Sequence, residues 1–292
     1  MPKRLPRTRT LKGDVKLAHY DSVTGVAGEP AIVLIHASLD RSEDWENVFP
    51  RLGTRYRTIA YDQRGHGKSE RATDYSLRAF AVDAIHVVRD LAKGPTVVIG
   101  HSLGALAALG VAAALPDQVT GLVLEDPAMQ WGTPWDTTTY GPLRDALKAN
   151  DPAALRKAVD RFPLPSPGPR GERTYGEMRG FYASERVLTY FKDVDPAFID
   201  AKIAGEDAKD LIVGWLATVT APTLVLAGEP RLGSNLDDAA EWKLKKGIAS
   251  KDVTVKRFPG TGHVIHGYRP EQFLENLEPF LRRLRAPAPA PD

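Results

Sequence analysis

One pentapeptide limits the folds open to this chain more than any other feature. Gly100-His-Ser-Leu-Gly104 stands between a β-branched run, Thr96–Ile99, and an Ala- and Leu-rich segment, Leu103–Leu115. The run predicts a buried strand and the segment predicts a helix. A Gly-x-Ser-x-Gly match anywhere in the chain is expected by composition only about 0.07 times. Between a strand and a helix the motif is typical of a turn too tight for a Cβ two residues to either side of the serine. Ser102 is therefore a candidate nucleophile.

The rest of the chain alternates short apolar runs with segments of helical period. Further strands are predicted at Ala31–Ile35, Tyr56–Tyr61, Val119–Leu124, Thr223–Ala227 and Val253–Phe258, and further helices at Ser76–Leu91 and Glu271–Leu284. A continuous apolar run such as Ala31–Ile35 is typical of a parallel strand that is covered on both faces. The succession predicts an α/β protein with a mostly parallel, doubly wound sheet.

The pattern changes after Asp126. No strand is predicted from residue 127 to 220, whereas Asp151-Pro152 and Asp195-Pro196 each indicate a helix start, with an N-cap before a proline at the first helical position. The Pro- and Gly-rich stretch between them, residues 163–171, is a predicted loop. We expect residues 1–126 and 221–285 to form one core, residues 127–220 to form an inserted helical lid, and residues 286–292 to form a disordered Ala/Pro tail.

Aromatic residues are concentrated in the predicted lid. Eleven of the 23 Phe, Tyr and Trp residues fall within residues 128–220. These rings either build a small helical core or form the apolar wall of a pocket. For the second case we expect substrate contacts from Trp131, Trp135 and Tyr182, together with His36 at the end of the strand Ala31–Ile35.

Composition excludes several classes of protein. The chain has 292 residues, and its 39 Lys and Arg against 37 Asp and Glu leave a net charge of +2, so we expect neither a nucleic-acid nor a membrane partner. Cysteine is absent, which excludes a disulfide scaffold, thiol catalysis and cysteine-ligated metal. No run approaches the ~18 apolar residues of a membrane span, and the basic start lacks the apolar part of a signal peptide. These features predict a cytoplasmic protein.

Five segments together resemble the α/β-hydrolase superfamily of serine hydrolases and occur in that family's order. They are Val33-Leu-Ile-His-Ala37, Asp62-Gln-Arg-Gly-His-Gly-Lys-Ser69, Gly100-His-Ser-Leu-Gly104, Leu122-Val-Leu-Glu-Asp-Pro127 and Gly260-Thr-Gly-His263. The resemblance extends from about residue 17 to residue 284 and is weakest over the predicted lid. It implies the α/β-hydrolase fold with a helical lid and a triad of Ser, His and an acid.

A serine hydroxyl needs a base to become a nucleophile. The resemblance implies a base on a loop after the last strand, where His263 follows Phe258, and His266 is the second candidate. The spacing His263-x-x-His266 could suit a metal, but no third ligand cluster accompanies it. We expect neither a metal nor a cofactor.

The acid departs from the commonest pattern of the family. Arg231 occupies the position after the seventh strand where relatives often carry the acid. A subset of the family, including haloalkane dehalogenases and some lactone hydrolases, takes its acid from the end of strand six, which implies Asp126. Glu125, Glu229, Asp237 and Asp238 remain alternatives, and Asp126 could instead merely cap the start of the lid.

An oxyanion that forms during acyl transfer needs preorganised N–H donors. The turn at Ser102 supplies the N–H of Leu103, and the resemblance implies a second donor in the loop after Ile35. By position this donor is the N–H of Ser38, although Ala37 stands where relatives commonly have glycine.

The resemblance implies a serine hydrolase. A serine at position 102 argues against epoxide hydrolases and haloalkane dehalogenases, which use a carboxylate nucleophile. We expect cleavage of a carboxylic ester or lactone of a bulky, largely neutral small molecule through an acyl-Ser102 intermediate. Thioesterase, carbon–carbon hydrolase and perhydrolase chemistry stay open, as does a hydrolase-fold protein that binds a small molecule without turning it over. A homodimer also stays open.

Overall fold

The computed structural model describes residues 9–11, 14–130, 132–168, 171–178 and 181–284, and it describes no side chains at 9–11 and 181–184. The predicted tail, 286–292, lies outside the described residues. None of the described helices combines the length and the apolar character that crossing a membrane requires.

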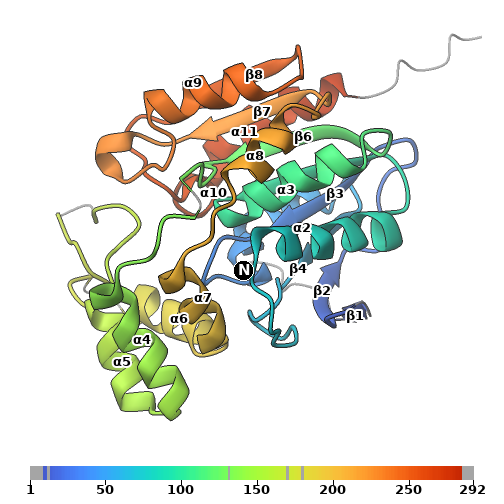
Figure 1. The fold of residues 1–292 in the computed structure, drawn as a ribbon. Coiled ribbons are helices and arrows are strands. Elements are labelled where there is room, and N and C mark those ends of the chain that lie inside the picture. The colour runs from blue at the N-terminus through green and yellow to red at the C-terminus, as the bar shows by residue number, and fades with distance from the viewer. Residues whose placement is uncertain (1–8, 12–13, 131, 169–170, 179–180, 285–292) are drawn as a thin grey trace, which may run out of the picture.

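An eight-stranded sheet forms the centre of the molecule (Figure 1). Its strands are β1 (Arg9–Leu11), β2 (Leu17–Asp21), β3 (Ala31–Ile35), β4 (Thr58–Tyr61), β5 (Thr96–His101), β6 (Val119–Glu125), β7 (Thr223–Ala227) and β8 (Val253–Arg257), in the order β1-β2-β4-β3-β5-β6-β7-β8. β1 pairs with β2, and β2 with β4, in antiparallel fashion, whereas the other neighbouring strands are parallel. The predicted α/β fold with a mostly parallel sheet is confirmed.

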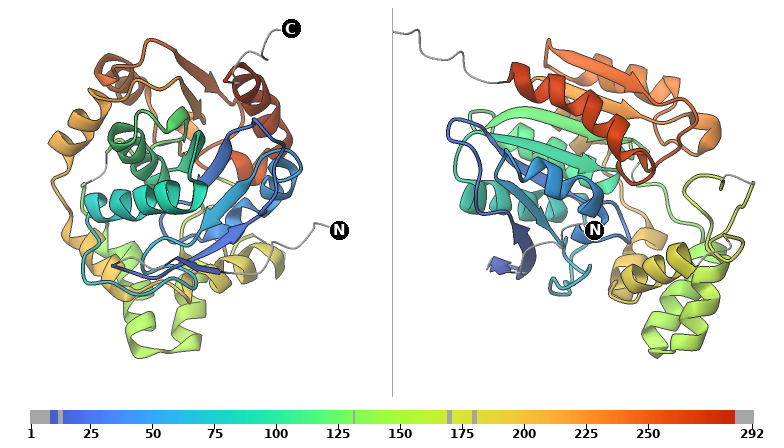
Figure 2. Two further views of the ribbon diagram at one scale, coloured as in Figure 1. Left: turned by 90° about the vertical axis from the view of Figure 1, so that its right-hand side faces the viewer. Right: turned by 180° about the vertical axis from the view of Figure 1, so that it is seen from behind.

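Helices cover both faces of the sheet (Figure 2). Alternate residues of β3 show why, because Val33 and Ile35 join one buried cluster whereas Ile32 and Leu34 join another. The first cluster contains side chains of α2 (Leu77–His86), its π-helical continuation η2 (Val87–Ala92), α3 (Leu103–Ala114), α8 (Lys209–Leu216) and α9 (Asp238–Gly247). The second contains side chains of the 3₁₀ helix η1 (Ser42–Asn47), α1 (Phe49–Leu52), α10 (Ile265–Tyr268) and α11 (Pro270–Arg283).

Four inserted helices lie together to one side of this core (Figure 1). They are α4 (Thr137–Ala149), α5 (Pro152–Arg161), α6 (Phe181–Phe191) and α7 (Pro196–Ala204). Asp151 and Asp195 cap α5 and α7 as predicted, each accepting a hydrogen bond from a backbone N–H of the first turn. The next helix, α8, packs on α3 instead, so the inserted segment rejoins the core before β7.

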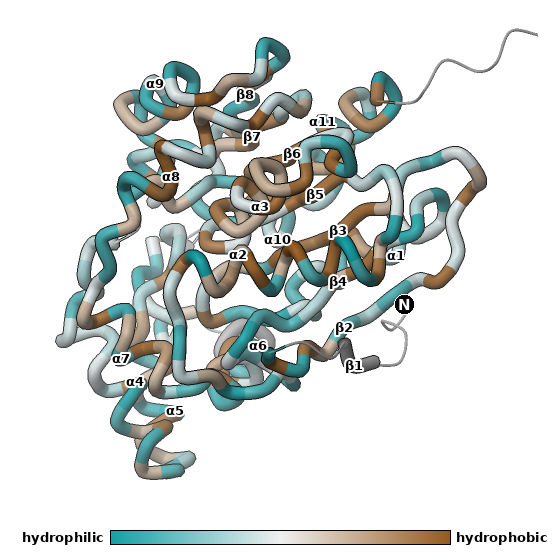
Figure 3. The backbone as a smooth tube through the Cα atoms, turned by 45° about the vertical axis from the view of Figure 1, so that its right-hand side comes forward, coloured by the Kyte–Doolittle hydropathy of each residue, from teal (hydrophilic) through white to brown (hydrophobic). Residues whose placement is uncertain are grey.

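The apolar runs that predicted strands form the interior (Figure 3). β3 and β7 begin and end as predicted, and the other predicted strands shift by at most two residues at either end. The predicted helix 76–91 is confirmed, although its last part is π-helical. The antiparallel pair β1 and β2 was not predicted, because these short strands lack a continuous apolar run.

Candidate active site

Ser102 occupies a sharp turn between β5 and α3. Its backbone has φ 55° and ψ −113°, a conformation that non-glycine residues rarely adopt. A Cβ on Gly100 would lie 2.1 Å from the carbonyl oxygen of Gly104, and one on Gly104 would lie 2.3 Å from that of Ile35. The expected exclusion of Cβ atoms from this turn is therefore confirmed, and the serine stands at the end of a central strand.

Two other residues with positive φ lie at the same edge of the sheet. Leu39, in the loop after β3, has φ 67°, and Asp126, directly after β6, has φ 42°. Strained backbone of this kind persists where the surrounding structure enforces it, and it clusters at active sites. The carboxyl ends of β3, β5 and β6 thus converge on one site.

His263 and Asp126 meet at this edge. The Nδ1 atom of His263 lies 2.5 Å from Oδ2 of Asp126, across 137 residues of sequence. The Asp126 side chain is fully buried, whereas the His263 side chain is 15% exposed. His263 and Ser102 line the same cavity. The carboxylate fixes one ring nitrogen of His263, which leaves the other for exchange with a substrate or a hydroxyl.

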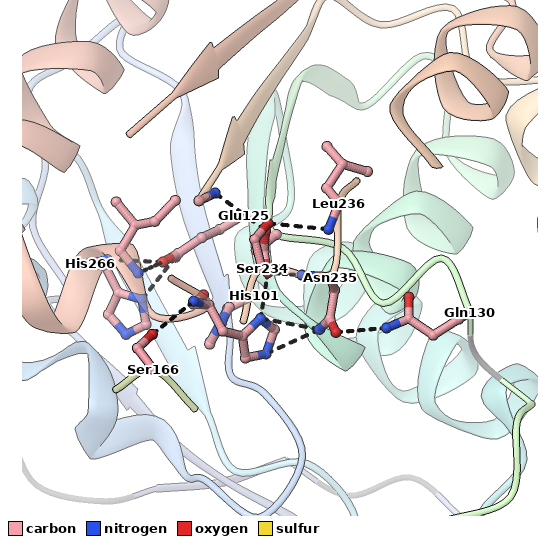
Figure 4. Close-up of polar contacts among 12 residues, drawn as sticks. His101, Glu125, Gln130, Ser166, Ser234, Asn235, Leu236 and His266 are labelled. Carbon is pink, nitrogen blue, oxygen red and sulfur yellow. Dashed lines mark hydrogen bonds and ion pairs between the residues drawn. The ribbon is translucent and has the colours of Figure 1, made fainter. Parts of the chain in front are cut away.

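The loop after β7 supplies donors to Asp126 rather than an acid. Ser234 donates its hydroxyl hydrogen to Oδ1, and the N–H of Asn235 donates to Oδ2 at 2.7 Å. The side-chain Nδ2 of Asn235 lies 3.1 Å from Nδ1 and 3.4 Å from Nε2 of His263. Gln130 in turn donates to Oδ1 of Asn235 (Figure 4). Sequence reasoning missed Ser234 and Asn235, because no spacing rule points to them.

The other candidate acids have partners of their own. Glu229 accepts the N–H of Gly260 and pairs with Arg231, Asp237 caps α9, and Asp238 pairs with Arg257. None of these carboxylates contacts His263 in the part of the chain that the structure describes. Arg231 itself is on the surface, with a side chain that is 79% exposed.

The backbone of His263 is held from two sides. Its N–H donates to Oγ of Ser166, which belongs to the loop after α5, at 3.2 Å. Its carbonyl accepts the Nε2–H of His101, the residue before Ser102, at 2.9 Å. Burial lowers the pKa of His101 to about 4, so this ring is neutral at physiological pH. His101 is thus a donor to the loop of His263, a role that the sequence did not indicate.

The two predicted oxyanion donors are available. Among the described residues, the N–H groups of Ser38 and Leu103 have no hydrogen-bond partner. Leu103 is fully buried, and buried backbone N–H groups without a partner are rare in folded proteins, whereas Ser38 is half-buried. The Ser38 side chain lines the cavity beside Ser102. Two unpaired N–H groups near the candidate nucleophile suit an anionic oxygen.

A cavity of about 750 Å³ lies above Ser102 and His263. This volume suits a small organic molecule. The inserted segment, in its helices and next to their ends, contributes a wall of Trp135, Tyr140, Phe162, Tyr190 and Phe191. The cavity therefore joins the edge of the sheet to α4–α7.

Of the four predicted substrate contacts, Trp135 lines the cavity as expected. Trp131 lies outside the described residues, and Tyr182 lies in α6 with its side chain outside them. The prediction for His36 is wrong: its ring is fully buried and does not line the cavity. It donates to the carbonyl of Ala37 at 2.7 Å and accepts the N–H of Gln63 at 2.9 Å, so it braces the loop instead.

His266, the second candidate base, is fully buried and hydrogen-bonds to Glu125 and Asp44. The potential metal-ligand atoms of Asp44, His101 and His266 lie within 4.8 Å of one another, which is close enough for a metal site. Both ring nitrogens of His266 are already hydrogen-bonded to carboxylates, so the cluster is a hydrogen-bonded charge network. Because neither nitrogen of His266 faces the cavity, this histidine is unsuited to deprotonate Ser102.

Fold and site together define an α/β hydrolase. The sequence profile of the Alpha/beta hydrolase family matches residues 32–276, and the chain therefore belongs to this family. It is 30% identical over 258 residues to the 2-(acetamidomethylene)succinate hydrolase of Mesorhizobium japonicum, covering 86% of this chain and 88% of that protein. The (E)-2-((N-methylformamido)methylene)succinate hydrolase of Acinetobacter baylyi is 26% identical over 87% of this chain and 90% of its own.

Solved structures agree on the fold. The crystal structure of an esterase from Rhodococcus sp. superposes with a TM-score of 0.71 at 23% identity, covering 95% of this chain and 98% of that one. At this level of identity the likeness supports the fold alone. Relatives of this chain are thus named as hydrolases, and the residues described above must supply the argument for a particular reaction.

Proposed function

We propose that this protein is a serine hydrolase that cleaves a carboxylic ester or lactone of a bulky, largely neutral substrate through an acyl-Ser102 intermediate. One observation carries the proposal. Ser102, on its strained turn, and His263, hydrogen-bonded to the buried Asp126, line the same cavity. This is the arrangement of nucleophile, base and orienting acid that acyl transfer needs.

Each residue of the site has a step in this reaction. Oγ of Ser102 attacks the acyl carbonyl while His263 takes the hydroxyl proton, which it then gives to the leaving oxygen. Asp126 accepts Nδ1–H of His263 and stabilises the imidazolium that forms. The N–H groups of Ser38 and Leu103 bind the oxyanion. Water then attacks the acyl enzyme with His263 again acting as base, and this releases the acid.

The cavity supports a largely neutral substrate. Its cations already have anionic neighbours, since Arg186 lies 3.3 Å from Asp44 and Lys202 lies 3.8 Å from Glu206. Aromatic rings of the inserted helices cover much of the remaining wall. We infer that these helices are a lid that encloses the body of the substrate.

A second candidate is hydrolysis of an amide-type bond in a substrate that bears a carboxylate. Lys202 favours it, because this cation is only 5% exposed and lines the cavity. The names of two relatives, which contain a substituted succinate, agree with this direction. In this candidate the substrate carboxylate pairs with Lys202 near the end of α7, beside Glu206, whose carboxylate lies 3.8 Å from Lys202.

The test uses a fluorophosphonate probe on the wild type and on Ser102→Ala, with p-nitrophenyl acetate and butyrate as substrates. We expect labelling and turnover in the wild type and neither in Ser102→Ala. A panel of aryl esters, macrocyclic lactones and 2-(acetamidomethylene)succinate then separates the two candidates. A folded wild type that neither labels nor turns over any member of the panel would overturn the proposal in favour of ligand binding without catalysis.

A further inference from the structure

His266 lies three residues after His263 and is clamped between two carboxylates. Its Nδ1 is 2.8 Å from Oε2 of Glu125, and its Nε2 is 2.9 Å from Oδ2 of Asp44. The ring stacks on Trp45, with 4.0 Å between ring centroids and 24° between ring planes. A neutral imidazole has only one N–H, so donation to both carboxylates requires the imidazolium form.

The charges on either side agree with this state. Burial alone would lower the pKa of His266, but the facing carboxylates of Glu125 and Asp44 raise that pKa to about 10. Burial works to raise the pKa of both carboxyl groups, yet the imidazolium holds each pKa below its ordinary value. The neutral His101 is the other titratable ring beside it, at 5.3 Å between centroids.

Glu125 ties this cation to the backbone that follows His263. Its second oxygen, Oε1, accepts the N–H of Ile265 at 2.7 Å and the N–H of His266 at 2.9 Å (Figure 4). The carbonyl of His263 is held by His101. Since Glu125 directly precedes Asp126 at the end of β6, one strand end holds both the ring of His263 and the backbone beyond it.

Asp44 carries the same network to the inserted helices. Its Oδ1 lies 3.3 Å from Nη2 of Arg186, a residue of α6. Arg186 also donates to the hydroxyl of Tyr190 at 2.8 Å and pairs with Glu46 at 2.9 Å. The order Glu125, His266, Asp44 and Arg186 is thus a chain of alternating charges from the sheet to α6, and only Arg186 among the four side chains is more than about an eighth exposed.

We propose that His266 is a positioning residue that holds the loop of His263 in its reactive place, and that Asp44 and Arg186 couple this loop to the lid. The proposal rests on the proposed function, in which His263 is the base. His266 touches no substrate and exchanges no proton in the reaction. Its role is to keep Glu125 and Asp44 together across the segment that places His263.

The first experiment compares the wild type with His266→Gln, which is neutral and cannot donate to both carboxylates. With p-nitrophenyl acetate, a substrate too small to span the cavity, we expect kcat to fall about tenfold to a hundredfold, as misplacement of a catalytic group by about 1 Å does. KM should change by less than about threefold, because binding of the small ester does not depend on the loop. Fluorophosphonate labelling should slow in step with kcat.

Two arginine variants test the coupling to the lid. Arg186→Gln removes the contact to Asp44, whereas Arg156→Gln removes a comparable ion pair between α5 and Glu185 of α6, at 2.6 Å, that does not reach Asp44. We expect Arg186→Gln to lower kcat severalfold and Arg156→Gln to leave it unchanged. In the His266→Gln background, Arg186→Gln should have little further effect, since both act through one network.

Imidazole ¹⁵N spectra of the wild type provide a spectroscopic check at pH 8.5, where both nitrogens of His266 should still carry protons. A folded His266→Gln protein with unchanged kcat and labelling would overturn the proposal, as would a wild-type His266 that is neutral at pH 8.5. If His266→Gln does not fold, equal kcat values for Arg186→Gln and Arg156→Gln would overturn it. Failure of the wild type to label or turn over would instead overturn the proposed function.

Discussion

Two carboxylate–histidine pairs stand side by side in this protein, and only one of them suits catalysis. Asp126 and Glu125 are consecutive residues at the end of β6, and their partners, His263 and His266, are three residues apart. Both pairs therefore use the same strand end and the same loop. Residue type and spacing do not distinguish them.

The surroundings of His263 and His266 distinguish the two pairs. The His263 side chain is 15% exposed and lines the cavity, and it faces one carboxylate. His266 has no exposed surface, and a second carboxylate, that of Asp44, occupies its other nitrogen. A histidine between two buried carboxylates is held as a cation and cannot accept a proton, whereas one that faces a single carboxylate and a cavity can. The number of carboxylates and access to the cavity thus separate the pair that we propose for catalysis from the pair that we propose for positioning.

The largest expected effect concerns the ring that faces the cavity. His263→Ala should lower kcat by roughly five to six orders of magnitude, because the nucleophile loses its base. Circular dichroism and steady-state kinetics with p-nitrophenyl butyrate check this expectation. A folded His263→Ala protein with kcat within tenfold of the wild type would remove His263 from the mechanism and reopen the comparison between the two pairs.

Asp126→Asn should cost less, roughly three to four orders of magnitude in kcat, since the base remains but loses the group that orients it. Arg231→Ala is the matched control, because it alters the position where relatives often carry the acid, and its exposed side chain contacts only Glu229. That control should stay close to wild type in the same assay. A silent Asp126→Asn together with a crippling change at Glu229 or Asp237 would show that the acid is elsewhere.

Compared with Asp126→Asn, Glu125→Gln should cost more stability and less activity. Removing one partner leaves the buried His266 with less compensation, so we expect a loss of roughly 3–5 kcal/mol in the free energy of unfolding. The loss in kcat of the folded fraction should be smaller than that of Asp126→Asn. Urea unfolding and kinetics on both variants provide the comparison. If Asp126→Asn proved the more destabilising and Glu125→Gln the more damaging to kcat, the roles of the two pairs would be exchanged.

The smallest effect is a pH dependence of stability that belongs to His266. Its pKa is raised to about 10 in the folded protein against roughly 6.5 when unfolded, so its contribution is complete below pH 6.5 and is lost as pH rises through 10. Each pH unit in that interval should remove up to about 1.4 kcal/mol. The titratable groups around it are Glu125, Asp44, His101 and Asp40, and the carboxyl of Asp40 has its pKa raised by burial and by Asp44.

Urea titrations at pH 6, 7, 8 and 9 on the wild type and His266→Gln measure this contribution as a difference. The difference is needed because burial lowers the pKa of Lys202 to about 8, and this makes stability rise with pH above that value. We expect the advantage of the wild type over His266→Gln to shrink steadily from pH 7 to pH 9. A constant advantage would show that His266 is neutral in the folded protein.

The turn at Ser102 and the positions of the parallel strands along the chain could be predicted because their causes are local. Gly100 and Gly104 lie within two residues of Ser102, and the apolar run of β3 is continuous in the sequence. His36 shows the limit of that reasoning. Its place after β3 predicted contact with substrate, but the ring turns into the protein and bonds to Gln63, 27 residues away. The direction of a side chain depends on neighbours that the local sequence does not name.

By itself, the sequence determined the α/β fold, the inserted helices and the pentapeptide that carries Ser102, because periodicity, capping and steric exclusion act over a few residues. The tertiary structure decided which carboxylate meets which histidine. Asp126 reaches His263 across 137 residues, Glu125 reaches His266 across 141, and Asp44 reaches it across 222. Such pairings, the two carboxylates that hold His266 as a cation, and the cavity that His263 faces exist only once the sheet has brought distant strand ends to a common edge.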